Sequence, residues 1–304
     1  MSTSKLAIRM ERGLRQGDPL SPFLFDIAVQ GLAVLFNKAS DSGLQTSQGH
    51  HITHLQYAND TLIFLPNDYS SLLHVKRILR WFEIISGLKV NFYKSSLIGI
   101  NLDIEYTSGL ANTIFYRSDS FPVRYLGLPL GANPNRLSTW KPVLSTIRAK
   151  LNKWKGKFLS MAGRICLIKS VLNSLPLYYM SVFTMPKGIA KSISSINRCF
   201  LWKGSSNSHG ICKVAWHKVI KSKPLGGLGL GSIHSKNLAL MFKWLWNLDK
   251  GVAGGWQELI LRKYQPHFTN GLPVFAGSLS LTWCSMVSAI SLNHSIAAPI
   301  QCWV

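Results

Sequence analysis

The sequence contains little negative charge. Twelve Asp and Glu stand against 34 Lys and Arg in 304 residues, which gives a formal net charge of +22 and a pI of about 10.0. The shortage is also local, because positions 120 to 248 hold no Asp or Glu but twenty Lys and Arg. Cations without acidic neighbours cannot form ion pairs along a helix surface. The imbalance therefore indicates a polyanionic partner.

Cysteine is scarce as well, and no two cysteines are closely spaced. The five are Cys166, Cys199, Cys212, Cys284 and Cys302. An odd number without close pairs favours reduced thiols in an intracellular protein over a disulfide framework. Cys199 and Cys212 could join His209 and His217 in a four-ligand cluster, but twelve residues separate the two cysteines. A zinc knuckle usually separates them by roughly two to four, so we expect no zinc site.

Long uninterrupted apolar runs are also missing. The most apolar stretch, from Ile165 to Met185, contains Lys169, Asn173 and Pro176, and a membrane span needs about 20 predominantly apolar residues. The first five residues are not followed by the apolar core of a secretory signal. We therefore expect an intracellular protein, nuclear or cytoplasmic, with no membrane partner.

A polar loop followed by an apolar helix occupies residues 12 to 39. In the string Arg12–Pro22, Asp18 can cap free N–H groups and Pro19 suits the first helical position. The residues that follow remain apolar at helical spacing, which predicts a helix from Pro19 to Ala39. A helix N-terminus beside arginines attracts phosphate.

A β-hairpin is predicted next. Residues 51 to 57 and 61 to 65 have the composition of strands, and Ala58-Asn59-Asp60 lies between them. A turn of this kind exposes its acidic side chain at the tip of the hairpin. Asn59 also has a purely structural explanation, because Asn tolerates positive φ in turns.

These two segments resemble consecutive motifs of the reverse transcriptases of LINE-type non-LTR retrotransposons, in the form common in plant genomes. The second motif usually reads Phe or Tyr, then Ala-Asp-Asp, and here it reads Tyr57-Ala58-Asn59-Asp60. The resemblance covers residues 11 to 248 in family order, through Ser86–Ser95 (the next palm motif), Arg124–Leu130 (the primer-gripping hairpin), Phe200–Gly204, Trp216, Pro224–Gly229 and Asn237–Trp246.

The resemblance implies an α+β fold, with a partial right-hand polymerase palm of antiparallel strands and helices followed by a mostly α-helical, thumb-like or connection-like domain. We place the partial palm at residues 1–130, the basic helical domain at 131–250, and a poorly defined C-terminal segment at 251–304. The chain is 47% hydrophobic and long enough for two cores. A palm that lacks some of its strands is expected to expose an apolar face and an open sheet edge.

The resemblance also implies nucleotide addition with two Mg²⁺ or Mn²⁺ ions held by carboxylates. Asn59 stands where the family carries the first aspartate of its pair, so Asp60 is the remaining metal ligand at this degenerate turn. Residues 1 to 11 hold no match for the family's upstream catalytic aspartate. We therefore predict that this polypeptide has no polymerase activity and binds the cofactor poorly.

Other site residues follow from the resemblance. RNA template, DNA primer and incoming nucleotide are expected to contact Arg12, Arg15, Gln16 and Gly17. Lys94 occupies a position that the family places near the nucleotide phosphates, although a solvated lysine at a strand end explains it equally well. Tyr57 is expected to pack beneath the turn. The oligomeric state stays open.

A basic amphipathic helix is predicted at the start of the second domain. Its apolar members recur every three or four residues: Trp140, Leu144, Ile147, Leu151, Trp154 and Phe158. We expect this stripe to pack in a core. Five cations fall largely off the stripe and are predicted to contact nucleic-acid phosphates: Arg148, Lys150, Lys153, Lys155 and Lys157.

Four further expectations concern local structure. Residues 69 to 86 are predicted to form a helix capped by Asn67 or Asp68 and ended by Gly87. Short strands are predicted at 88–91 and 97–100. The glycine-rich string 224–231 fits neither common phosphate-loop pattern and is interpreted as a turn. Residues 251–304 show weak periodicity, which suggests low order.

Three functional hypotheses fit the sequence. The chain is a catalytically impaired reverse transcriptase fragment, a non-catalytic nucleic-acid-binding protein, or the product of a decaying element without a selected role. Asn59 and the absent upstream carboxylate separate the first hypothesis from the other two, but the sequence separates the last two poorly.

Overall fold

The computed structural model describes residues 17–41, 53–154, 158–204, 212–250, 255–264, 268–269 and 272–273. The chain divides into two compact units, residues 1–130 and 131–304, which are described separately. Five of the predicted site residues lie outside the described ranges: Arg12, Arg15, Gln16, Lys155 and Lys157.

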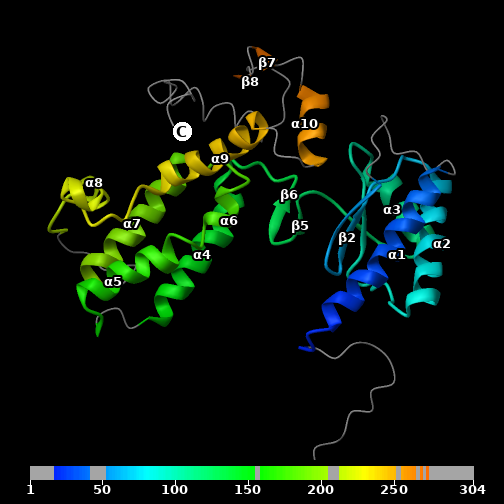
Figure 1. Cartoon of the computed structure of the whole chain (residues 1–304), viewed down its shortest axis with the longest axis horizontal. Helices are drawn as coiled ribbons and strands as arrows, with labels where there is room; N and C mark the ends of the chain where they lie inside the picture. Colours follow the sequence, from blue (N-terminus) through cyan, green and yellow to red (C-terminus); the bar gives the residue numbers. More distant parts are fainter. Residues whose placement is uncertain are drawn as a thin grey trace, which may run out of the picture. The chain divides into compact units, whose positions relative to one another are not determined.

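The first unit mixes helices with short strands (Figure 1). Its elements are α1 (Ser21–Asp41), β1 (His54–Tyr57), β2 (Asp60–Ile63), α2 (Tyr69–Ser86), β3 (Ser96–Ile98), α3 (Ile104–Ile114), β4 (Arg117–Asp119), β5 (Val123–Tyr125) and β6 (Leu128–Leu130). The pairs β1–β2 and β5–β6 are antiparallel, whereas β3–β4 is parallel. The predicted hairpin and the mixed α and β character are confirmed.

The core of this unit lies between α1, α2 and the first hairpin. Leu32 and Phe36 of α1 meet Val75 and Phe82 of α2, and Ile63 of β2 packs against them. Each such side chain contributes about 1.5–3 kcal/mol when it leaves water. The ring of Phe36 also stacks on His54 at 5.0 Å between centroids, and burial lowers the pKa of His54.

Helix α2 has the predicted bounds because both of its ends carry local signals. The carboxylate of Asp68 accepts hydrogen bonds from the backbone N–H groups of Ser70 and Ser71. At the other end Gly87 adopts φ 73°, a left-handed conformation that costs glycine little, and its N–H donates to the Glu83 carbonyl. Of the two predicted caps, Asp68 is therefore the one that acts.

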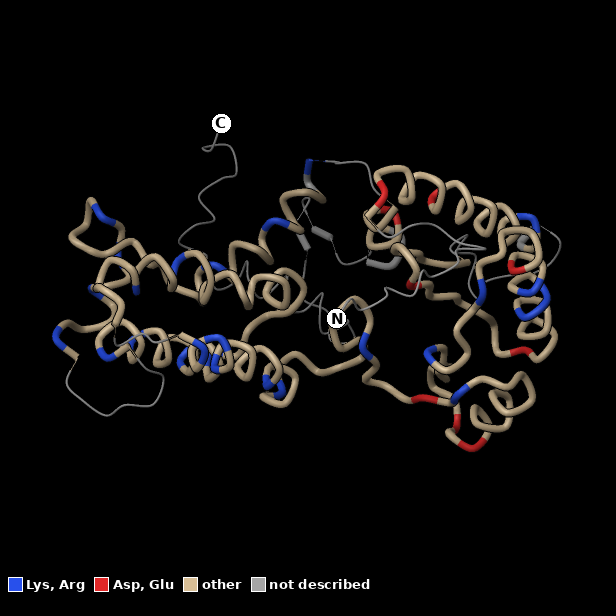
Figure 2. Tube along the Cα trace, turned by 90° about the horizontal axis from the view of Figure 1, so that it is seen from below, with Lys and Arg blue, Asp and Glu red and all other residues tan. Residues whose placement is uncertain are grey.

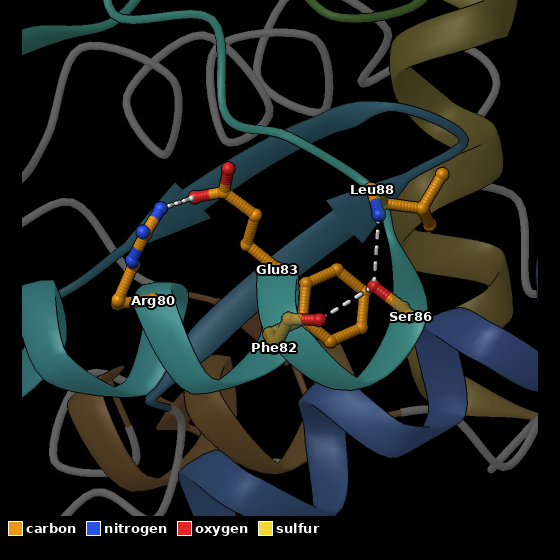
Figure 3. Close-up of polar contacts among 5 residues, drawn as sticks. All are labelled: Arg80, Phe82, Glu83, Ser86 and Leu88. Atoms are coloured by element: carbon orange, nitrogen blue, oxygen red, sulfur yellow. Dashed lines mark hydrogen bonds and ion pairs between the residues drawn. The ribbon is translucent and has the colours of Figure 1, made fainter. Parts of the chain in front are cut away.

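The strand predicted at 88–91 is wrong. The Ser86 hydroxyl donates to the Phe82 carbonyl at 2.6 Å and accepts the N–H of Leu88 at 3.1 Å, as Figure 3 shows. That N–H is then not free for a strand ladder, and the chain passes into a turn in which Lys94 N–H donates to Asn91 O. The other predicted strand forms at 96–98 as β3.

Helix α1 buries one stripe and exposes the rest. Asp18 Oδ1 accepts from the N–H of Leu20 at 2.9 Å just before the helix starts at Ser21, two residues later than predicted. Phe23 and Ile27 are each 67% exposed, so this helix presents apolar side chains to solvent. Among the described helices, the stretch Ser21–Ala39 is long enough to cross a membrane, and its mean hydropathy of 1.2 would allow it. In this stretch 11% of the residues are buried. One such helix is weak support for a membrane span.

The second unit is mainly helical (Figure 1). Its elements are α4 (Leu137–Lys153), α5 (Met161–Leu167), a π-helical turn (Ile168–Leu172), α6 (Leu177–Met180), α7 (Lys187–Lys203), α8 (Trp216–Val219), a 3-10 turn (Lys223–Leu225), α9 (Ile233–Asp249), α10 (Gly255–Tyr264), β7 (Phe268–Thr269) and β8 (Leu272–Pro273). Helix α7 packs against α4, α5 and α9.

The predicted apolar stripe on α4 packs into the core of the second unit. Trp140, Ile147 and Leu151 are buried, and the indole N–H of Trp140 donates to the Pro134 carbonyl at 2.9 Å. Phe158 does not belong to the stripe, because α4 ends at Lys153 and the ring of Phe158 is 85% exposed. The predicted core packing therefore holds for Trp140 and for Trp154, whose ring lies 5.8 Å from that of buried Phe200, and is wrong for Phe158.

Buried asparagines connect the helices of the second unit. Asn237 of α9 has no exposed surface; its amide donates to the carbonyls of Met180 and Phe183, and its oxygen accepts the N–H of Met185. This one side chain thus satisfies three backbone groups between α6 and α7, which would cost free energy if left unpaired in the interior. The string around Asn237 therefore has a structural role.

The glycine-rich string after α8 is a close-packed turn, as predicted. A Cβ on Gly227 would lie 2.1 Å from the Lys221 carbonyl oxygen, so only glycine fits. The N–H groups of Gly229 and Gly231 donate to the carbonyls of Lys221 and Ile220. These amides are occupied within the protein and cannot cradle a phosphate.

Candidate functional site

The tip of the first hairpin presents the candidate catalytic residues. Tyr57 pairs with Asp60, which leaves Ala58 and Asn59 as a two-residue turn. The positive φ of this turn, 50°, falls on Ala58. The structural explanation for Asn59, tolerance of positive φ, is therefore not needed at that position. Asp60 is the first residue of β2, so the strand ladder fixes where its backbone lies.

Asn59 and Asp60 are adjacent and both exposed, and Tyr57 beside them is 65% exposed. The expectation that Tyr57 packs beneath the turn is wrong, because on a two-strand hairpin its side chain points to a face that no described element covers. The side-chain amide of Gln56 donates to the Ala58 carbonyl at 3.2 Å and ties the turn together. The tip is a defined but solvent-exposed platform.

This platform does not fit a divalent-metal centre. Within the described ranges, no group of three or more His, Cys, Asp or Glu is placed to hold a metal ion. The donors at the tip are one carboxylate, Asp60, and one neutral amide, Asn59. Mg²⁺ prefers anionic oxygens in near-octahedral geometry, and a single exposed carboxylate supplies little of that. We therefore derive no catalytic step through a metal.

The other predicted nucleotide-binding residues lie on separate segments. Gly17, the first described residue, has φ 87° and is exposed ahead of α1. Lys94 is exposed in the turn that follows α2, and its backbone N–H donates to Asn91. That Gly17 and Lys94 lie together around a nucleotide, as the resemblance implies, stays a prediction.

The segment that resembles the primer grip forms a tight hairpin. Val123 pairs with Leu130 and Tyr125 with Leu128, so Leu126 and Gly127 make the turn. Both turn residues have positive φ, 47° and 82°, which is the pattern of a type I′ hairpin turn. A leucine in this conformation is strained, since its Cβ crowds the backbone. Strain of this kind is often found at functional positions.

The second unit presents exposed cations on α4. Arg148, Lys150 and Lys153 are all exposed on α4, and Figure 2 shows the Lys and Arg positions of the helical unit in blue. The sequence has no Asp or Glu from position 120 to position 248. Partial burial and the nearby charge of Lys169 lower the pKa of Lys236. Positive charges therefore repel one another within this unit.

A groove in the second unit was not found by sequence reasoning. It lies between α7, α8 and the start of α9, has a volume of about 590 Å³, and is lined in part by Lys187, Lys191, Arg198, Trp216 and His234. Three of these residues share one face of α7, so the spacing of basic residues along that helix was the available signal. That these three residues and Trp216 line one groove depends on tertiary packing, which a local sequence pattern does not show.

Comparison with known proteins finds a family match in the first unit. The family described as reverse transcriptase (RNA-dependent DNA polymerase) matches residues 3–130. A protein of Arabidopsis thaliana whose name describes a ribonuclease H protein is 33% identical over 52% of this chain and 26% of its own length. An uncharacterized 149 kDa transposon protein of Xenopus laevis is 26% identical over 64% of this chain and 15% of its length.

A third relative extends the same pattern. A retrovirus-related Pol polyprotein from a type-1 retrotransposable element of Popillia japonica is 34% identical over 32% of this chain and 13% of its own length. The chain thus spans 13% to 26% of these three relatives. Residues 3–130 therefore match the reverse transcriptase family, and two of these relatives are named as transposon or retrotransposon proteins.

Proposed function

We propose that this chain is a fragment of an RNA-directed DNA polymerase from a LINE-type, plant-form non-LTR retrotransposon, and that it does not polymerise as this polypeptide. One observation carries the proposal: within the segment that matches the reverse transcriptase family, the exposed hairpin tip offers Asn59 and Asp60 in place of two aspartates.

The physical reason is the charge at the tip. Two-metal catalysis holds a pair of divalent cations a few ångströms apart, and carboxylates must offset their mutual repulsion. An amide oxygen carries no net charge, so replacing one aspartate by Asn59 halves the anionic charge that the tip supplies. Solvent exposure at the tip weakens each remaining interaction further.

Primer extension on an RNA template tests this proposal. We expect no product from this chain with Mg²⁺ or Mn²⁺. The Asn59→Asp variant shows whether the amide alone accounts for the loss of polymerisation. The Asn59→Asp, Asp60→Asn double variant is the matched control, because it has the same net charge as the parent. Template-dependent product from the unmodified chain would refute the proposal, whereas product from Asn59→Asp that disappears in the double variant would support it.

A second candidate function is nucleic-acid binding without catalysis, with an RNA template and a DNA primer as the family's partners. It is favoured by the exposed cations of α4 in a region that has no acidic residue. Each phosphate contact on duplex DNA adds about 0.9 to the slope of log affinity against log salt. We therefore expect the Arg148→Gln, Lys150→Gln, Lys153→Gln variant to reduce that slope by up to about 2.7.

Fluorescence anisotropy with a labelled duplex over a range of salt concentrations measures this effect. Lys89→Gln is the control, because Lys89 is exposed in the first unit. An unchanged slope in the triple variant would remove α4 from the binding surface.

A further inference from the structure

The groove between α7, α8 and α9 combines positive charge with an aromatic ring. Helix α7 supplies Lys187, Lys191 and Arg198, which are exposed, and α8 supplies Trp216, which is half-buried at the groove. The cations stand at positions i, i+4 and i+11 of one helix, so they form a row about 16 Å long. Among the described residues that line the groove, none is acidic.

The remaining lining combines four polar side chains with Ala190 and Ile233. Ser194 and Ser195 lie between the cations on α7, and Ser232 and His234 come from the start of α9. The buried Nδ1 of His234 has no hydrogen-bond partner among the described residues.

These features select a ligand with a charged backbone and flat rings. A row of cations follows a phosphate backbone, and an aromatic side chain stacks on an unpaired base, which is how sequence-independent single-strand sites are built. A duplex hides the faces of its bases, so it would engage the cations but not the Trp216 ring in the groove. The shape and chemistry therefore discriminate between single and double strands.

We propose that the α7–α8–α9 groove is a binding site for single-stranded nucleic acid, with phosphates along Lys187, Lys191 and Arg198 and one base stacked on Trp216. The proposal rests on nucleic-acid binding by this unit but assigns a different place and a different form of the ligand from the α4 surface. RNA and DNA share the chemistry that the groove recognises, and the experiment compares them.

Direct binding of short labelled single strands to the full chain tests the site. We expect Trp216→Ala to weaken binding to single-stranded RNA or DNA about 10- to 100-fold, with little change for a duplex of the same length. Trp216→Phe keeps a stacking ring and should restore most of the affinity, which separates stacking from a folding defect. Trp81→Ala is the matched control, because Trp81 is an exposed tryptophan on α2 of the first unit.

Two further arms separate the role of charge from the role of base stacking. Lys187→Gln with Lys191→Gln should reduce the salt slope for single strands by about 0.7 for each phosphate that the variant no longer binds, whereas Lys243→Gln, exposed on α9 outside the groove, should not. Inorganic polyphosphate has charge but no bases, so its affinity should depend on the lysines and not on Trp216.

The outcomes distinguish the groove from the α4 surface. Equal losses of affinity for single strand, duplex and polyphosphate in Trp216→Ala, without rescue by Trp216→Phe, would overturn the site. Normal single-strand binding by Trp216→Ala while the chain still binds duplex would overturn the groove but leave the α4 surface intact. Failure of the unmodified chain to bind any nucleic acid would overturn both proposals.

Discussion

The hairpin of the first unit exposes its amide and carboxylate side chains, whereas the helices of the second unit bury an amide. In the first unit, Asn59 and Asp60 project into solvent from a two-strand ribbon, and apolar side chains of α1 are exposed as well. In the second unit, Asn237 is buried with its amide bonded to three backbone groups, and cations occupy the surface.

The difference indicates which unit has polar groups that fix a single conformation. A buried and fully bonded amide is costly to break, so it fixes one arrangement of helices. An exposed turn is held by its ladder, by the core beneath it and here by one solvent-exposed side-chain hydrogen bond, so it tolerates substitution. The second unit is therefore expected to be the more rigid, and the first to be the more adaptable at its functional tip.

The largest expected effect is that of Asn237→Ala. The substitution leaves the Met185 N–H and two carbonyls without partners in the interior, so we expect the free energy of unfolding of the second unit to fall by roughly 3 kcal/mol. Urea denaturation followed by tryptophan fluorescence measures it. Asn152→Ala, an exposed asparagine on α4, should change it by less than about 0.5 kcal/mol, and equal effects of the two variants would contradict the contrast between buried and exposed amides.

A second test concerns the exposed side of α1. Replacing Phe23 and Ile27 by Ser should reduce self-association of the chain, because it removes a contiguous apolar surface. The free energy of unfolding should change by less than about 0.5 kcal/mol, since both side chains are mostly exposed. Sedimentation velocity at several concentrations gives the association state. Leu32→Ser, on the buried stripe of the same helix, is the contrasting variant and should destabilise the unit.

If the double variant sediments as the parent does, the apolar face of α1 is not an association surface. If Leu32→Ser proves as harmless as the double variant, the core between α1 and α2 contributes less than its burial indicates. Either result would weaken the contrast between the exposed side chains of the first unit and the buried side chains of the second.

Local signals explain which parts of the fold were predictable. Asp68 and Gly87 fix the ends of α2 through contacts within a few residues, and the spacing of Trp140, Ile147 and Leu151 fixes the buried side of α4. The hairpin at Tyr57 was also predictable, because strand composition and a short turn are local properties.

The failures required information that a local pattern does not contain. Helix α3 was not predicted, and the strand expected at residues 88–91 does not form because the Ser86 hydroxyl accepts the Leu88 N–H. The predicted stripe on α4 extended to Phe158 because periodicity does not show where a helix ends. At the site, the turn was predicted, but the exposure of Tyr57 depends on what covers the hairpin.

The smallest expected effect compares two helix caps within the first unit. The side-chain and backbone hydrogen bonds that Asp68 accepts from Ser70, and then those from Ser71, lower the pKa of its carboxyl from 3.8 to about 2. Asp103 caps α3 without a side-chain hydrogen bond. Asp68→Ala should lower the thermal midpoint by about 2–4 °C at neutral pH, and Asp103→Ala should lower it less.

The pH dependence identifies the charge as the cause. Because the pKa of Asp68 is lower in the folded state, its contribution is complete above pH 3.8 and is lost as the pH falls through about 2. Asp68→Asn keeps a capping oxygen but cannot ionise, so its deficit relative to the parent should shrink progressively as the pH falls through that interval. Thermal unfolding by circular dichroism from pH 6 to pH 2 measures it. A deficit that stays constant over this range would show that the hydrogen bonds at this cap do not depend on the carboxylate charge, and that the exposed caps of the first unit act through geometry alone.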